Sequence, residues 1–158
     1  MRSLGRVEHL AAGAFGAPGK RTFFLEVGSA HEREWFILEK EQVAALAAHG
    51  LELLGEASGT VPEPLSGPLP LRAPAGEPTF RVGEIGLGAE AGELLVLLSP
   101  DEDGEPVAFS VDAPLFATMA RRALAVAAAG RPKCRLCGLP LDPDGHACPG
   151  GNGDRHRR

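Results

Sequence analysis

Two stretches of this sequence, residues 1–55 and 80–130, show the same order of elements, and this repetition constrains the fold more than any other feature. In each half, three short segments rich in aliphatic and aromatic residues precede one with helical spacing of apolar residues. The predicted helices begin near Lys40 and Asp112, 72 residues apart. Two half-buried sheets complete one core only together, so we expect an α+β fold with antiparallel sheets and two helices. Residue identity across the offset is slight, so both duplication of a β-β-β-α unit and chance similarity stay open.

The first half contains three strand candidates, of which the first has the weakest pattern. They are Arg6–Phe15, Arg21–Val27 and Glu34–Leu38. Glycine-containing turn sequences separate them, and the last two are expected to form a β-hairpin. From Lys40 to about Leu54 the apolar residues fall near helical periodicity, with Gly50 either a C-terminal stop or a weak point.

The second half ends in the best-marked element of the chain, a helix after Asp112. Three strand candidates precede it, Phe80–Leu87, Leu94–Leu98 and Val107–Val111. Asp112 is a typical N-cap residue, and Pro114 fits the first turn. An apolar stripe follows at Phe116, Met119, Ala120, Ala123 and Ala127, and Gly130 and Pro132 end the helix. Arg121 and Arg122 fall off this stripe, which favours a solvated face over a binding patch.

Residues 56–79 contain six prolines and no usable periodicity. Proline cannot supply ladder hydrogen bonds, so we expect this proline-rich segment to form an exposed, mobile loop. The chain is thus divided into an α+β body, residues 1–130, and a tail, residues 131–158.

The body and the tail carry opposite net charge. Residues 1–130 hold 10 basic and 18 acidic side chains, a net charge of −8, whereas residues 131–158 hold 6 basic and 3 acidic ones, a net charge of +3. Nonspecific nucleic-acid binding depends on Lys and Arg, and base stacking depends on aromatic residues. The body is acidic and the chain has no Tyr, so a nucleic-acid partner is not expected, and only the tail could favour one.

No stretch reaches the roughly 18 apolar residues of a membrane span. Arg2 and Arg6 before an Ala-rich stretch imitate a secretory signal, but Glu8 and His9 interrupt it. We therefore expect a cytoplasmic protein without a membrane partner, where thiols stay reduced.

The three cysteines, Cys134, Cys137 and Cys148, lie within a 15-residue window of the tail. Their odd number and their clustering favour a metal site over a disulfide framework. Cys-x-x-Cys followed by Gly138 places two thiolates on one tight turn. A second turn sequence follows, and residues two apart on a strand face the same way. His146 and Cys148 would therefore complete a Cys₃His tetrahedron around zinc.

Four protein ligands fill the coordination that zinc prefers, so the predicted site is closed and structural. Two alternatives stay open: a solvated tail with free thiols, and a catalytic zinc that binds water in place of one ligand. His156 is a substitute ligand in the same tail.

The sequence context of the other motifs argues against a binding or catalytic site. Gly13–Lys20 imitates a phosphate-binding loop, but a strand rather than a helix follows it. The glycines of Gly83–Gly88 favour a hairpin or bulge, and the Asp101–Asp112 stretch lacks the glycine of a calcium loop. His9, His31 and His49 have no partner in a recognisable catalytic frame.

Several segments together resemble an actinobacterial family catalogued as domain of unknown function three-zero-nine-zero. They are Gly16–Leu25, Leu38–Val43, Phe80–Gly83, Arg121–Leu124 and Cys134–Cys148 with the following Pro149. The resemblance covers nearly the whole chain, and its most specific part is the cysteine-containing tail. It implies a lineage and a shared fold, but no activity.

Three functional hypotheses follow from the sequence. The first is a noncatalytic adaptor whose structural zinc stabilises the tail and whose surface binds a protein partner. The second is an enzyme with a pocket in the body, remote from the zinc. The third, and the weakest, is nucleic-acid binding through the basic tail. An exposed apolar patch without a pocket of convergent titratable groups would favour the adaptor.

Overall fold

The computed structural model describes residues 1–17, 19–58, 72–128, 146–147 and 155–156. Its elements confirm the α+β class. In chain order they are β1 (Arg2–Arg6), β2 (His9–Phe15), β3 (Thr22–Gly28), β4 (Arg33–Leu38), α1 (Lys40–Ser58), β5 (Val82–Glu90), β6 (Glu93–Pro100), β7 (Val107–Asp112), α2 (Ala113–Ala128), β8 (His146–Ala147) and β9 (Arg155–His156).

The predicted order of three strands and a helix occurs twice, as β2-β3-β4-α1 and as β5-β6-β7-α2. The first three strands form an antiparallel sheet in the order β2-β3-β4. The second three also pair antiparallel, and β1 joins them in parallel to give a four-stranded sheet in the order β1-β7-β6-β5. The backbones of β8 and β9 pair antiparallel as a separate short ribbon.

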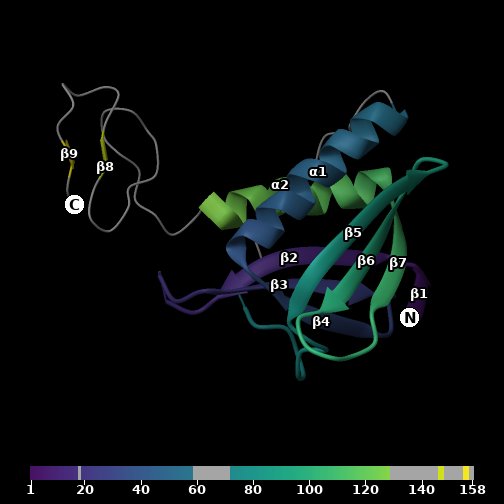
Figure 1. The fold of residues 1–158 in the computed structure, drawn as a ribbon, viewed down its shortest axis with the longest axis horizontal. Helices are drawn as coiled ribbons and strands as arrows, with labels where there is room; N and C mark the ends of the chain where they lie inside the picture. Colours follow the sequence, from purple (N-terminus) through teal and green to yellow (C-terminus); the bar gives the residue numbers. More distant parts are fainter. Residues whose placement is uncertain (18, 59–71, 129–145, 148–154, 157–158) are drawn as a thin grey trace.

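The two main sheets are connected at both edges, so the strands of the two sheets together form a nearly closed ring (Figure 1). At one junction the chain runs from β1 directly into β2, and Val7 N donates a hydrogen bond to Ser110 O at 2.9 Å. At the other, an isolated parallel bridge links Ile37 of β4 to Arg81, just before β5. The hydrophobic core lies between the sheets and the two helices, which pack against each other on one side.

Helix α2 begins and packs as its sequence predicts. The Asp112 carboxylate accepts a hydrogen bond from Leu115 N at 2.9 Å, which confirms Asp112 as the N-cap. The predicted apolar stripe is buried throughout: Phe116, Met119, Ala120, Ala123 and Ala127. Arg121 is exposed as expected, whereas Arg122 is half-buried and not simply solvated.

Helix α1 is longer than predicted. It continues through Gly50 to Ser58, so Gly50 neither ends nor interrupts it. A Cβ atom at position 50 would lie only 2.1 Å from the ring of Phe116 on α2. The glycine is therefore a site of close helix packing, and the helix extends into the segment that we expected to be a loop.

The far end of the expected 56–79 loop is attached to β4. Trp35 Nε1 donates a hydrogen bond to Gly76 O at 3.1 Å, and Thr79 N donates one to Trp35 O at 2.7 Å. Residues 72–79 contain no helix or strand and are mostly exposed, and the mobility of this loop stays a prediction. Residues 59–71 lie outside the described part of the chain.

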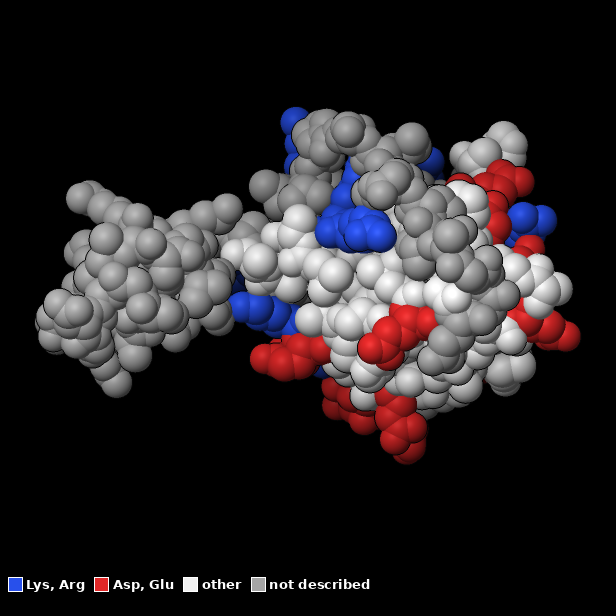
Figure 2. Space-filling view, turned by 90° about the horizontal axis from the view of Figure 1, so that it is seen from above, with Lys and Arg blue, Asp and Glu red and all other residues white. Residues whose placement is uncertain are grey.

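The helices of the described residues are α1 and α2. Neither combines the length and the apolar character that a membrane-spanning helix needs. Viewed from above the helices, Figure 2 shows acidic side chains mostly along the lower and right edges, and Lys and Arg mostly in the centre and upper part. The coloured residues therefore form no single extended basic surface on this side.

Candidate functional site

The predicted zinc ligands lie almost entirely outside the described residues. Cys134, Cys137 and Cys148 belong to this undescribed part, and His146 is described only as part of strand β8. The backbone pairing of β8 with β9 sets His146 opposite His156, the substitute ligand considered from the sequence. The zinc site thus stays a prediction. Within the described residues, no group of three or more His, Cys, Asp or Glu side chains could hold a metal ion.

The described body offers a different candidate, the outward-facing side of the four-stranded sheet. Side chains alternate between the two faces of a strand, and on β6 the residues Leu94, Val96 and Leu98 point into the core. The residues between them, and their partners on β5 and β7, point outward. Ser3 and Gly5 of β1 line the same depression, and Arg6, the partner of Ser110, contacts the acidic end of the strands. We call this set the outer sheet face: Ser3, Gly5, Gly86, Gly88, Leu95, Leu97, Ala108 and Ser110.

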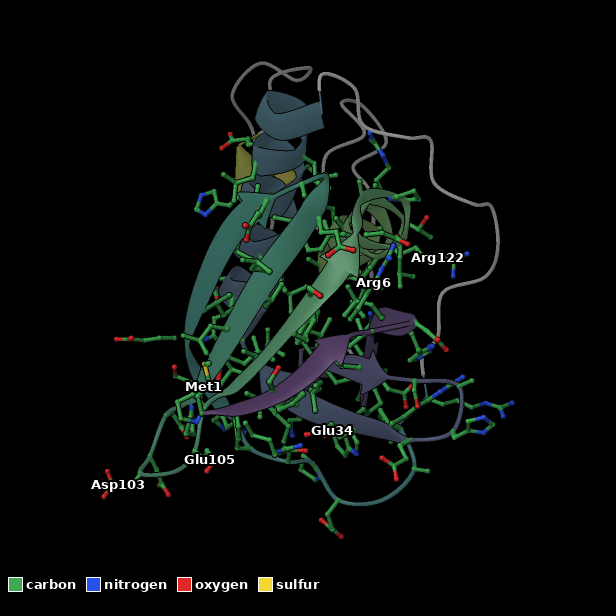
Figure 3. All side chains as sticks on the ribbon, turned by 90° about the vertical axis from the view of Figure 1, so that its right-hand side faces the viewer. Met1, Arg6, Glu34, Asp103, Glu105 and Arg122 are labelled. Carbon is green, nitrogen blue, oxygen red and sulfur yellow. The ribbon has the colours of Figure 1, made fainter. Side chains whose placement is uncertain are left out.

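The outer sheet face is uncharged and made of small residues around two leucines. Leu97 lies between Gly86 and Ala108, and Leu95 lies between Gly88 and Ser110. Because the neighbours of the leucines have small side chains or none, a shallow depression of about 470 Å³ lies over these strands. Leu95 is 44% exposed, an unusual value for a leucine at the centre of a sheet. Figure 3 shows the four strands side by side, with the helices behind their upper part.

Acidic residues surround this uncharged centre at both ends of the strands. Residues 82–112 contain eight Asp and Glu and no Lys or Arg. At one end, Glu90 pairs across the sheet with Glu93, and Glu93 with Asp112. Arg6 lies 3.0 Å from Glu93 and 3.4 Å from Asp112, which neutralises part of this end.

The opposite end of the strands is more acidic. Glu84 is the outward residue of β5 there, placed by a bulge between Val82 and Glu84. The turn that joins β6 to β7 adds four exposed carboxylates, Asp101, Glu102, Asp103 and Glu105. Figure 3 shows Asp103 and Glu105 beside Met1 at this end. Of the acidic residues that imitate a calcium loop in the sequence, Asp101 and Asp103 therefore lie in an exposed acidic turn, and Asp112 lies at the opposite end of β7.

A second electrostatic cluster fastens β1 to β4. The Arg2 guanidinium donates two hydrogen bonds to the Glu34 carboxylate, at 2.6 and 2.9 Å. Thr79 Oγ1 donates a third to Glu34 at 3.1 Å. Hydrogen bonding from Arg2 lowers the pKa of Glu34, and the same bond raises the pKa of Arg2. Each charge stabilises the other, so this pair is a structural link between the two sheets and does not offer a reactive group.

Two further hollows flank the junction of β1 and β2, and several of their polar groups have structural partners. One contains Arg6 and Asp112, which pair with each other. The other contains Ser29 and His31 in the β3–β4 turn. The Ser29 hydroxyl accepts hydrogen bonds from His31 N and Glu32 N, so it stabilises the turn and is not positioned beside a base.

The rejected sequence motifs lie where the sequence context predicted. Residues of the apparent phosphate loop belong to β2 and to the turn into β3, in which Gly16 and Gly19 adopt φ angles of +103° and +83°. Gly83 lies at the bulge of β5, and Gly86 and Gly88 lie within that strand. His9 of β2 contacts Glu26 of β3 at 2.7 Å, a cross-strand pair.

Sequence reasoning missed the outer sheet face because it depends on register. Gly86 and Gly88 gave a signal only for local backbone geometry. Their pairing with Leu97 and Leu95, and the pairing of those leucines with β7, are set by the assembled sheet. The available signal was the stretch 82–112, which has eight acidic residues and no Lys or Arg. The net charge of the whole body does not show where these residues lie.

Comparison with known proteins places the chain in a family. The family model described as "Protein of unknown function (DUF3090)" matches residues 3–148. The search of curated proteins and the search of solved structures gave no match. The match spans both β-β-β-α units and reaches Cys148, the last predicted zinc ligand. The chain therefore belongs to the DUF3090 family, as its sequence motifs predicted.

Proposed function

We propose that this protein is a noncatalytic, cytoplasmic protein-interaction module that binds a partner protein through the outer sheet face. The observation that carries the proposal is an uncharged, leucine-centred sheet face within a strongly acidic segment. An exposed apolar patch with a polar rim is typical of a binding surface. The spacing of the three cysteines favours metal binding over disulfide pairing, which supports a reducing, cytoplasmic location.

The same face argues against chemistry at this position. Catalytic sites bring together titratable groups in a concave pocket. Here the depression is lined by Met1, Phe109 and glycine, alanine, serine and aliphatic residues, none of which has a titratable side chain, and the nearest carboxylates lie at its two ends. Acidic ends also repel a phosphate backbone, which disfavours nucleic acid as the partner of this face.

The proposal includes a structural zinc ion in the tail, held by Cys134, Cys137, His146 and Cys148. Its support is the ligand set and its spacing in the sequence. Zinc would contribute folding free energy to a tail that is too short to bury a core of its own. It has no part in the binding surface of the body.

Site-specific photocrosslinking tests the binding surface. Leu95 is replaced by the photoreactive p-benzoylphenylalanine in cells of the source organism, and Glu52, an exposed residue of α1, is replaced in a matched control. We expect a discrete crosslinked protein from position 95 that position 52 does not give. The purified partner should then bind the wild-type protein and not Leu95→Asp. Equal crosslinking from both positions, or no crosslink from position 95, would overturn the proposal.

A further inference from the structure

Building on this proposed function, we infer that the outer sheet face binds an amphipathic helix that carries Lys or Arg at both ends. The helix lies along the strands, with its apolar stripe on Leu95 and Leu97. Its more basic end lies beside the acidic turn of residues 101–105. Both the shape and the charge of the sheet lead to this class of partner.

The shape of the face fits a helix. The inner side of the sheet already packs against α1 and α2, while Leu95 on the outer side is 44% exposed, so a partner can add a layer on the outer side. Small residues let a helix approach closely, because Gly86 and Gly88 place no side chain beside Leu97 and Leu95. An extended peptide would instead pair with a free strand edge, which a face does not offer.

The spacing of the acidic ends sets the length of the helix. Glu84 and Glu90 are six residues apart on β5, which corresponds to about 20 Å along the strand. A helix rises 1.5 Å per residue, so about 13 residues span this distance. The partner helix should therefore have an apolar stripe of three to four turns between two groups of basic residues.

The distribution of charge sets the direction of the helix. The end near the β6–β7 turn has five carboxylates, Glu84, Asp101, Glu102, Asp103 and Glu105. The opposite end has Glu90, Glu93 and Asp112, and Arg6 pairs with two of them. The first end is thus the more negative one. A partner with unequal basic ends gains more Coulomb energy when its more basic end lies there.

A second copy of this chain fits the face less well. Four strands and about 20 Å of strand length give an area of roughly 400 Å², about half of what each partner contributes to a standard stable interface. Two copies packed face to face would also bring acidic ends against acidic ends in either direction, which is unfavourable. The area instead suits a weak, transient contact with a short segment of another protein.

Stapled 16-residue peptides test the inference with the full-length protein. The staple keeps the peptides helical, since isolated helices of this length are marginal in water. The first peptide has a leucine stripe and Lys at both ends, the second has the same stripe and Glu at both ends, and the third has Lys ends and a scrambled stripe. Binding is measured by fluorescence anisotropy. We expect the first peptide to bind at least about tenfold more tightly than either other peptide.

Variants of the protein locate the contact. Leu95→Asp should weaken binding of the first peptide by about tenfold or more, because it places a charge beneath the apolar stripe. Glu84→Lys together with Asp103→Lys should weaken it several-fold, and the effect should fall in high salt, where surface charges are screened. Both sets of positions are exposed, and thermal melting checks that the variants fold.

A spin label on the more basic end of an asymmetric peptide checks the direction. It should broaden the amide signals of residues 101–105 more than those of residues 90–93. Broadening of the other end overturns the direction. Tighter binding of the Glu-ended peptide, abolished by Leu95→Asp, overturns the charge inference while the face remains a binding surface. If the Glu84→Lys and Asp103→Lys pair leaves the affinity of the first peptide unchanged, the charge inference also fails.

Discussion

The ring of Phe116 on α2 occupies the space directly above Gly50 on α1. Phe116 is fully buried, and a Cβ atom built at position 50 would lie 2.1 Å from its Cζ atom. A glycine in the middle of a helix normally destabilises it by about 0.5–1 kcal/mol relative to alanine. Here the missing side chain lets two helices pack closely and lets the ring fill the space between them.

We predict that Gly50→Ala destabilises the protein although alanine favours the helix. Overpacking a filled core costs about 1–3 kcal/mol, more than the gain in helix propensity. Gly55→Ala on the same helix is the matched control, because a Cβ atom there has nothing within 4 Å. That control should gain up to about 1 kcal/mol. Urea unfolding measures both, and equal effects of the two substitutions would show that Phe116 does not set the packing.

The link between Arg2 and Glu34 should make stability depend on pH. Because the pKa of Glu34 is lowered in the folded state, its contribution is complete above the ordinary glutamate pKa of about 4.3. That contribution is lost as the pH falls through the lowered value. We expect Glu34→Gln to cost up to about 1 kcal/mol at pH 7, a solvent-screened value for a partly exposed pair. The difference from wild type should shrink at acidic pH.

Unfolding of the two proteins between pH 2.5 and 7 measures this effect. Glu52→Gln, a change at an exposed position of α1, serves as the control and should show no such dependence. A Glu34→Gln variant whose deficit is the same at every pH would contradict the assignment.

Most of the fold could be predicted because its signals are local. Runs of aromatic and aliphatic residues in Thr22–Gly28 and Arg33–Leu38, with a turn between them, indicate a hairpin without reference to the rest of the chain. Asp112 specifies the start of α2 through a hydrogen bond three residues away. These features act over a few residues, which sequence patterns describe well.

What was missed depends on distant partners. Strand β1, Arg2–Arg6, has one apolar side chain among five residues, and it pairs with β7 about a hundred residues later. Gly50 appeared to be a weak point because the ring of Phe116 is 66 positions away in the sequence. The outer sheet face likewise exists only once β1, β5, β6 and β7 are in register. No short sequence pattern marks its neutral centre and acidic ends.

We predict that Trp35→Phe loosens the segment before β5. Trp35 Nε1 is the donor that holds Gly76 O, and the ring also contacts Phe15 and Phe24, with centroids 6.0 and 6.1 Å away. Phenylalanine keeps an aromatic ring but removes the donor, at a cost of about 1–2 kcal/mol. Hydrogen exchange of the Thr79 amide should accelerate more than exchange within β3. Uniform acceleration throughout the sheet would indicate a global effect instead.

One zinc ion per chain is predicted from Cys134, Cys137, His146 and Cys148. Elemental analysis of the purified protein should give one equivalent, and Cys137→Ser should lose most of it, because three remaining ligands bind zinc less tightly than four. Metal-free wild-type protein, or full zinc in the variant, would remove the site. X-ray absorption would show three sulfur ligands and one nitrogen ligand, and an exchangeable water would indicate an open, catalytic site.

Removal of zinc should separate the tail from the body. Small zinc sites provide roughly 10–16 kcal/mol of apparent binding free energy, so residues after Pro132 should lose their structure when a chelator is added. The body has a core of its own, with Leu25, Leu94 and Phe116 fully or almost fully buried between the sheets and the helices. It should keep a cooperative thermal transition, shifted by a few degrees at most if the tail packs on it. Hydrogen exchange with and without chelator compares the two regions directly. Loss of protection across residues 20–125 would mean that the zinc site is part of the core, because only a shared core would couple the two regions.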